Sequence, residues 1–213
     1  MEKGFHISLS NIGKRYYGRW LFRGLDMSLN IKDKLALIGT NGAGKSTLLR
    51  ILAGQLAPSE GKIQFMEGEK KIAISEVYQH LAWAAPSISL YADLTLKEHL
   101  RLHFQFKKSL VPDNQWVELL NLQHDADKKL RFYSSGMLQR VKIGLALFSD
   151  TPILLLDEPT ANMDSENADY LMQLIATYSQ NRILVVASNL PREYEQFPVQ
   201  LKIEKGKWLK GEA

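Results

Sequence analysis

The chain has 213 residues, of which 45% are hydrophobic and 23% are charged, and its formal net charge at pH 7 is +4. This length suits one compact α/β domain with room for a small inserted subdomain. The sequence has no cysteine, which excludes disulfides and thiolate metal sites. It has no run of about 18 apolar residues, so we expect no membrane-spanning helix and assign any membrane role to a partner. The mild basic charge suits ATP, anionic lipid or nucleic acid and does not discriminate between them.

The first part of the chain predicts strands that lead into a glycine-rich loop and a helix. Alternating apolar residues near the N-terminus are typical of half-buried antiparallel strands. A short apolar run then predicts a buried strand, and Gly54 is a stop signal for the helix after the loop. The predicted elements are strands at 5–9, 25–31, 35–38 and 72–77, and a helix at 45–53.

The middle of the chain, from about Leu81 to Phe148, is predicted to be helical. A capping box at Thr95 precedes apolar residues at helical spacing. Pro112 predicts the start of another helix, and Ser134 or Ser135 is expected to cap a third.

Strand signals return in the last part of the chain. The predicted elements are strands at 153–156 and 183–186, a helix at 167–178 between them, and a terminal hairpin of 199–203 and 207–209 around Gly206. Strands, then helices, then strand–helix units again predict a parallel-sheet core with an inserted helical subdomain.

The strongest motif lies between a predicted strand and a predicted helix. It reads Gly39-Thr40-Asn41-Gly42-Ala43-Gly44-Lys45-Ser46-Thr47 and fits G-x-x-x-x-G-K-[ST]. Glycines let the backbone curl so that N–H groups point at phosphate oxygens, and the helix adds unpaired N–H groups at its start. Lys45 is expected to bind the β- and γ-phosphates, and the Ser46 hydroxyl to ligate Mg²⁺. We therefore assign phosphate binding to Gly39, Asn41, Gly42, Ala43, Gly44, Lys45, Ser46 and Thr47, rather than a chance glycine-rich turn.

Two adjacent carboxylates follow the buried strand at 153–156. Ligands of parallel sheets gather at the carboxyl ends of the strands, so Asp157 is expected to hold Mg²⁺ together with Ser46. Glu158 leaves the strand and is expected to polarise the water that attacks the γ-phosphate. An acidic turn after a core strand is the structural alternative.

These two motifs and three others together resemble an ABC ATPase nucleotide-binding domain over nearly the whole chain. The others are Val77-Tyr78-Gln79-His80 for the Q-loop, Tyr133-Ser134-Ser135-Gly136-Met137 for the L-S-G-G-Q signature, and Ala161-Asn162-Met163-Asp164 for the D-loop. The resemblance implies an α/β fold with a P-loop NTPase core of mostly parallel sheet and an N-terminal antiparallel β subdomain. It implies one ABC ATPase domain over 1–213, with a helical subdomain at about 82–150.

The resemblance also assigns nucleotide contacts across a dimer. In the family the signature reaches the γ-phosphate bound to the opposite subunit, which assigns Ser134, Ser135 and Gly136 to that ATP, together with Asp164. A hydroxyl and a glycine at a helix start suit a second anion site, and a plain helix cap is the alternative. Gln79 is assigned as a catalytic sensor and as a ligand of Mg²⁺.

An aromatic residue that stacks on adenine is expected before the phosphate loop. Ungapped spacing favours Tyr16, whereas the aromatic-then-glycine pattern favours Tyr17, and an exposed tyrosine at a strand end is the alternative. Both residues stay candidates.

Three positions depart from the family pattern. Ser135 replaces a signature glycine, Met137 replaces the signature glutamine, and Ser188 occupies the place of a histidine that contacts the γ-phosphate. A serine is shorter and carries no charge, so it reaches the phosphate only through water. We expect slow but measurable hydrolysis, with Ser188 as a weakened catalytic residue.

The function implied is that of an ATP-hydrolysing transporter subunit on the cytoplasmic face of a membrane. Its expected partners are a second nucleotide-binding subunit and an integral membrane subunit, without nucleic acid. Trp83 and Tyr91 are candidates for the docking groove of the membrane subunit, with core packing as the alternative. The other possible functions are a soluble non-transport ABC ATPase and a regulatory module with weak hydrolysis. The transported substrate, its direction and homo- or heterodimerisation stay open.

Overall fold

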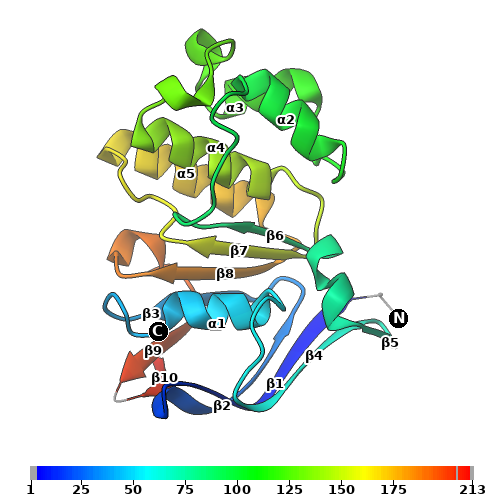
Figure 1. Ribbon diagram of the computed structural model, residues 1–213, viewed down its shortest axis with the longest axis vertical. Coiled ribbons are helices and arrows are strands. Elements are labelled where there is room, and N and C mark those ends of the chain that lie inside the picture. Colours follow the sequence, from blue (N-terminus) through cyan, green and yellow to red (C-terminus); the bar gives the residue numbers. More distant parts are fainter. Residues whose placement is uncertain (1–3, 205, 212–213) are drawn as a thin grey trace.

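Two β-sheets form the frame of the protein, for which a computed structural model describes residues 4–204 and 206–211 (Figure 1). The smaller sheet is antiparallel, in the order β2-β1-β4-β5. The larger sheet has the order β10-β9-β3-β8-β7-β6 and is parallel except for the β9–β10 hairpin. The strands are β1 (Phe5–Tyr16), β2 (Arg19–Asn30), β3 (Lys34–Ile38), β4 (Glu60–Glu67), β5 (Lys70–Ile72), β6 (Leu81–Ala84), β7 (Ile153–Asp157), β8 (Ile183–Ser188), β9 (Val199–Glu204) and β10 (Lys207–Gly211).

Most of the helices lie in the middle of the chain and in its last third. The α-helices are α1 (Lys45–Leu52), α2 (Leu96–Phe104), α3 (Trp116–Leu119), α4 (Ser135–Leu147) and α5 (Ser165–Tyr178). In Figure 1, α2 and α3 lie beyond α4 and α5, on the side away from the larger sheet. Within the described ranges, no helix has the length and apolar character needed to cross a membrane.

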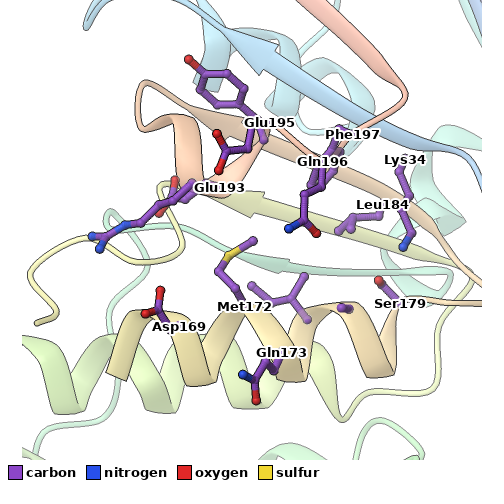
Figure 2. Close-up of a pocket in the computed structure, with 14 residues that line it drawn as sticks. Lys34, Asp169, Met172, Gln173, Ser179, Leu184, Glu193, Glu195, Gln196 and Phe197 are labelled. Carbon is purple, nitrogen blue, oxygen red and sulfur yellow. The ribbon is translucent and has the colours of Figure 1, made fainter. Parts of the chain in front are cut away.

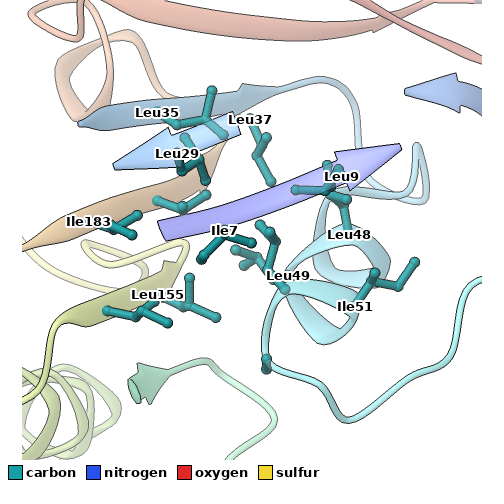
Figure 3. Close-up of a cluster of buried hydrophobic side chains, with 14 of the residues drawn as sticks. Ile7, Leu9, Leu29, Leu35, Leu37, Leu48, Leu49, Ile51, Leu155 and Ile183 are labelled. Atoms are coloured by element: carbon teal, nitrogen blue, oxygen red, sulfur yellow. The ribbon is translucent and has the colours of Figure 1, made fainter. Parts of the chain in front are cut away.

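Alternation along the central strands divides the apolar core into two halves. On β7, Ile153 and Leu155 pack with the cluster that contains α1 and the smaller sheet, whereas Leu154 and Leu156 pack with the helices α2, α4 and α5. Figure 3 shows the first half, in which residues of β1, β3 and α1 converge. Because successive side chains of a strand point to opposite faces, this register also fixes the direction of the polar residue that ends each strand.

Side-chain caps define where three helices begin. The Thr95 and Glu98 side chains form both bonds of a capping box at α2, as the sequence predicts. The Ser134 hydroxyl accepts from the Met137 N–H, 3.2 Å away, which makes Ser134 the cap of α4. Asp164 caps α5 in the same way, since its carboxylate accepts from the Asn167 N–H at 2.9 Å. The D-loop therefore ends at a helix start.

The structure corrects two of the predicted elements. The strand expected at 72–77 is wrong, because β5 ends at Ile72 and a 3₁₀ turn occupies Ile74–Gln79. Of its apolar side chains Val77 is buried and Ile74 is exposed, so they do not form one strand face. The start expected for the helical segment, at about Leu81, is also wrong, because 81–84 form β6 at the edge of the larger sheet and the first helix of the segment begins at Leu96.

The helix expected after Pro112 is shorter than its pattern suggests. Pro112 precedes a 3₁₀ turn at Asp113–Gln115, and α3 then covers only one turn. Asn121 follows with a φ of 57°. The left-handed conformation of this residue ends the helix before a second turn can form.

Candidate functional site

The phosphate loop joins β3 to α1 through a backbone that requires glycine. Gly44 is the N-cap of α1 and has a φ of 118°, outside the range that side chains usually allow. A Cβ atom added at Gly44 would lie 3.1 Å from the side chain of Leu21. The loop therefore passes close to β2, and both its conformation and its packing explain the glycine.

A cavity of about 290 Å³ lies over the start of α1. Lys45 is only 5% exposed, and its ammonium donates to the carbonyls of Gly39 at 2.6 Å and Thr40 at 3.2 Å. The positive charge of Lys45 is thus held against the backbone of the loop. The residues that line the cavity are Asn41, Gly42, Gly44, Lys45, Ser46, Thr47 and Glu158.

Asp157 ends β7 and faces α1. It has the same parity as Ile153 and Leu155, which pack on the α1 side of the sheet. Burial raises the pKa of the Asp157 carboxyl, a hydrogen bond with Ser46 lowers it, and the nearby Glu158 carboxylate raises it further. The structure therefore brings together two of the three side chains that the sequence assigns to Mg²⁺, Ser46 and Asp157, but not Gln79.

Glu158 lines the cavity from a strained backbone position. Its φ is 47°, in the left-handed region that side chains other than glycine, asparagine and aspartate rarely adopt. Its N–H donates to the Ala187 carbonyl at 2.9 Å. The Gln139 amide on α4 donates to the Glu158 carbonyl at 3.2 Å and to the Pro159 carbonyl at 3.3 Å. Conformational strain of this kind persists where surrounding bonds hold it.

Ser188 does not lie at the cavity over the start of α1. It has the parity of Leu184 and Val186 on β8, which pack on the α4 and α5 side of the sheet. The residue is fully buried and is absent from the lining of the cavity. Its hydroxyl donates to the buried Glu193 carboxylate. A catalytic role for Ser188 stays a prediction.

The signature lies outside the cavity of its own chain. Ser134 and Ser135 are exposed at the start of α4, and neither lines the cavity. A Cβ atom added at Gly136 would lie 3.0 Å from the Asn162 carbonyl oxygen, so the signature packs directly on the D-loop. Asp164 is exposed, and the hydrogen bonds from Asn167 hold the pKa of its carboxyl below the usual value. Their assignment to a second nucleotide stays a prediction.

Gln79 and the two tyrosines also lie away from the cavity lining. Gln79 is exposed at the end of the 3₁₀ turn, where its amide donates to the Tyr78 hydroxyl at 3.2 Å. Tyr16 is 44% exposed with the Lys14 ammonium 5.3 Å from its ring centre, and Tyr17 is fully exposed with a φ of 48°. Both tyrosine rings are therefore accessible for stacking on an adenine base, and the choice between them stays open.

Two buried residues were not singled out from the sequence. Gln139 and Glu193 both bond the turn that follows Asp157. Gln139 has a partial signal, since it lies on the helix that begins at the signature. Glu193 lies in an irregular segment after β8, where periodicity gives no sign of burial.

Known proteins match this chain in sequence and in fold. A model of the ABC transporter family matches residues 22–161, more than half of the chain. The molybdate import ATP-binding protein MolC of Haemophilus influenzae is 32% identical over 199 residues, which are 88% of this chain and 74% of MolC. The cytochrome c biogenesis ATP-binding export protein CcmA of Rhodopseudomonas palustris is 33% identical over 172 residues, which are 80% of this chain and 84% of CcmA.

Other relatives are much longer than this chain. The ATP-binding cassette sub-family A member 17 of mouse is 27% identical over 197 residues, and the match covers 88% of this chain but 11% of that protein. Among solved structures, the ATP binding subunit of an ABC transporter has a TM-score of 0.83 at 21% identity, covering 97% of this chain and 89% of the other. That structural likeness supports the fold alone.

The family match, the identities of 32% and 33% over most of both chains, and the shared fold agree with the site geometry. The P-loop NTPase fold expected from the sequence is confirmed. The chain belongs to the ABC transporter family, as an ATP-binding domain of the ABC type.

Proposed function

We propose that the chain binds and hydrolyses ATP as one subunit of a dimer and powers transport through a separate membrane subunit. The observation that carries the proposal is the convergence of Lys45, Ser46 and Glu158 on one cavity, with the Asp157 carboxyl next to Ser46. These groups come from α1 and from the end of β7. A nucleoside triphosphate placed there would have an ammonium, helix N–H groups and a carboxylate next to its terminal phosphate.

The donor set of this site fits Mg²⁺. The cation prefers oxygen ligands and commonly combines one or two protein groups with substrate phosphates and water. Ser46 supplies a hydroxyl and Asp157 a carboxylate, and the hydroxyl is close enough to lower the pKa of the Asp157 carboxyl. When bound, the cation would offset the negative charge of the phosphates. Gln79 is a proposed further ligand, although here its amide bonds Tyr78.

The residues of this chain divide the hydrolysis between them. Lys45 would hold the β- and γ-phosphates at the start of α1. Glu158 would orient a water molecule and take its proton as the water oxygen bonds to the γ-phosphorus. The bond between that phosphorus and the bridging oxygen breaks, and ADP and phosphate leave. The left-handed backbone at Glu158 carries the chain out of β7 and lets the carboxylate project into the cavity.

The exposed signature supports an ATP-dependent dimer. Ser134, Ser135 and Gly136 lie at the N-terminus of a 13-residue helix, the end whose dipole favours an anion. They do not line the cavity of their own chain. A second copy, or a close relative, would bring its γ-phosphate to this helix start, with Asp164 beside it. After hydrolysis that shared phosphate bridge is lost, and the dimer opens.

A groove of about 510 Å³ beside β6 and α2 is the proposed docking place of the membrane subunit. Tyr78 and Tyr91 are both about two-thirds exposed there, 64% and 66%, while Trp83 packs partly against the core. Burial lowers the pKa of His103 to about 4, so the groove carries a neutral imidazole at pH 7. The lining is mostly apolar, and Lys107 and Lys142 add two cations to it. Such a groove next to Gln79 suits a helix that reports nucleotide state to a membrane partner. This docking would place the chain on the cytoplasmic face of a membrane.

The test of the proposal is the Glu158→Gln variant. The amide keeps the size of the side chain but cannot take the proton, so ATP turnover should fall by at least about 100-fold while ATP binding persists. Size-exclusion chromatography with light scattering in saturating Mg-ATP should then show a stable dimer. Glu166→Gln, an exposed position on α5, is the matched control and should behave as wild type.

Two results would contradict the proposal. A Glu158→Gln chain that stays monomeric in Mg-ATP and hydrolyses at the wild-type rate would exclude both the dimer and the role of Glu158. A transport role would be excluded if the chain, isolated from its native cells under mild detergent, always lacked a membrane-spanning partner. In that case a non-transport ABC ATPase would be the function.

A further inference from the structure

Glu193 is a buried carboxylate that none of the steps above uses. It ends the 3₁₀ turn Pro191–Glu193 and is 1% exposed. One carboxylate oxygen accepts from the Thr160 N–H at 2.7 Å and from the Thr160 hydroxyl. The other accepts from the Ser188 hydroxyl. Three donors thus converge on a single anionic group, the arrangement that a buried carboxylate requires.

These donors belong to the two segments that fix the catalytic glutamate. Thr160 lies in the turn after Glu158, which the Ala161 N–H closes by donating to the Glu158 carbonyl at 3.1 Å. Ser188 follows Ala187, whose carbonyl accepts from the Glu158 N–H at 2.9 Å. Glu193 therefore bonds the turn on one side of Glu158 and the strand end on the other.

The hydrogen bonds of Ser188 hold the end of β8 firmly in place. The Ser188 hydroxyl oxygen also accepts from the Leu190 N–H at 2.9 Å, so it is engaged as donor and as acceptor. Its side chain faces α4 and α5, whereas Lys45 and Ser46 lie on the α1 side. The serine that stands in place of the family's histidine is thereby turned to Glu193.

We propose that Glu193 is a positioning residue for the hydrolysis proposed above: its carboxylate locks the turn 158–161 to the end of β8 and so fixes where the Glu158 carboxylate enters the phosphate cavity. This inference rests on the proposed function. Glu193 does not line the phosphate cavity. It lines a different pocket of about 360 Å³, between α5 and residues 191–197, which Figure 2 shows.

The chemistry of three donors explains why a carboxylate is needed. A glutamine at 193 has one oxygen for the Thr160 N–H and hydroxyl, and its NH₂ group cannot accept from the Ser188 hydroxyl. That hydroxyl would be left with the Leu190 carbonyl, 3.5 Å away, as its acceptor. Alanine would leave all three donors without their acceptor. Both changes loosen the turn without touching Lys45, Ser46 or Asp157.

The experiment compares Glu193→Gln and Glu193→Ala with Glu195→Ala. Glu195 is exposed in the same segment and lines the same pocket, which makes it a matched control. Because small misplacement of a catalytic group can cost on the order of 100-fold in rate, kcat should fall by at least about tenfold in Glu193→Gln. The KM for ATP should stay within about threefold, since the phosphate loop is intact. Glu195→Ala should retain the wild-type kcat and KM.

Hydrogen–deuterium exchange provides a readout that does not depend on turnover. Amides of 158–161 should exchange faster in Glu193→Gln than in wild type, with no change at 41–48. If Glu193→Ala does not fold, Thr160→Val removes one of the three donors at nearly constant volume. It should give the same change in exchange, in a smaller amount.

The outcomes separate this inference from the proposed function. A wild-type chain without ATPase activity would refute the proposed function, and faster exchange of 158–161 in Glu193→Gln would still support the lock. Unchanged exchange together with an unchanged kcat in Glu193→Gln would overturn it. A rise of KM that parallels the loss of kcat would mean that the phosphate loop is disturbed as well as the turn, and it would overturn the inference too.

Discussion

Asp157 meets two opposing demands at the residue scale. The proposed magnesium site needs the Asp157 carboxylate ionised, yet burial favours the neutral form and raises the pKa of this group above its usual value. The folded chain therefore binds a proton here more tightly than the unfolded chain does. Above the folded pKa, the ionised carboxylate lowers the free energy of unfolding, and this cost disappears as the pH falls through that pKa.

Asp157→Asn should therefore stabilise the nucleotide-free chain at pH 7. Its Tm should rise by roughly 2–4 °C for each kcal/mol gained, as measured by differential scanning fluorimetry. The additional rise that Mg-ATP gives to wild type should be lost, since a neutral amide binds the cation poorly. Asp169→Asn, at an exposed position on α5, should change neither value. A lower Tm in Asp157→Asn would show that its charge is already compensated.

At the scale of elements, α4 is held at both ends. Ser134 caps its N-terminus, and the buried guanidinium of Arg182 binds its C-terminus. Arg182 donates to the carbonyls of Leu147 at 2.9 Å and Ala146 at 3.3 Å, and to the Thr151 hydroxyl at 2.6 Å. A cation at this end of a helix also interacts favourably with the helix dipole. Burial lowers the pKa of Arg182 to about 10, so it remains charged at pH 7.

Arg182→Ala should reduce the free energy of unfolding by about 3 kcal/mol, because hydrogen bonds to a charged group are worth roughly 1.5–3 kcal/mol and the carbonyls lose their donor. Urea unfolding followed by circular dichroism measures this loss. Arg192→Ala, at an exposed position, should stay within about 0.5 kcal/mol of wild type. A loss below about 1 kcal/mol in Arg182→Ala would contradict the role of Arg182 in holding α4.

The elements that the sequence predicts well are those with a local signal. The capping residues Thr95 and Ser134 mark the starts of α2 and α4, and alternation or apolar runs mark most of the central strands. β6 has only four residues, and its apolar side chains serve both faces of the sheet, so its pattern does not distinguish strand from helix. The strand expected at 72–77 fails because solvent exposure of Ile74 is decided by tertiary packing.

The whole molecule shows why the site is harder to predict than the fold. Lys45, Ser46 and Glu158 follow from contiguous motifs, and the structure brings them to one cavity. Glu193 reaches the same turn from 33 residues beyond Thr160, through a segment without periodicity. Contacts of this kind depend on the path that the chain takes after the end of β8. A single sequence does not reveal that path.

Gln139 has a consequence for how the two sites of the proposed dimer would work together. Its amide ties α4, the helix that would sense a neighbour's nucleotide, to the backbone that carries the chain's own Glu158. In a dimer, the α4 of each chain would contact the nucleotide of the other chain while bonded to its own Glu158. The state of one nucleotide should therefore alter the rate of hydrolysis at the other site. Steady-state velocity should then rise sigmoidally with ATP concentration, with a Hill coefficient up to about 2. Gln139→Leu should return the curve to a hyperbola, whereas a hyperbola in wild type would mean that the two halves run independently.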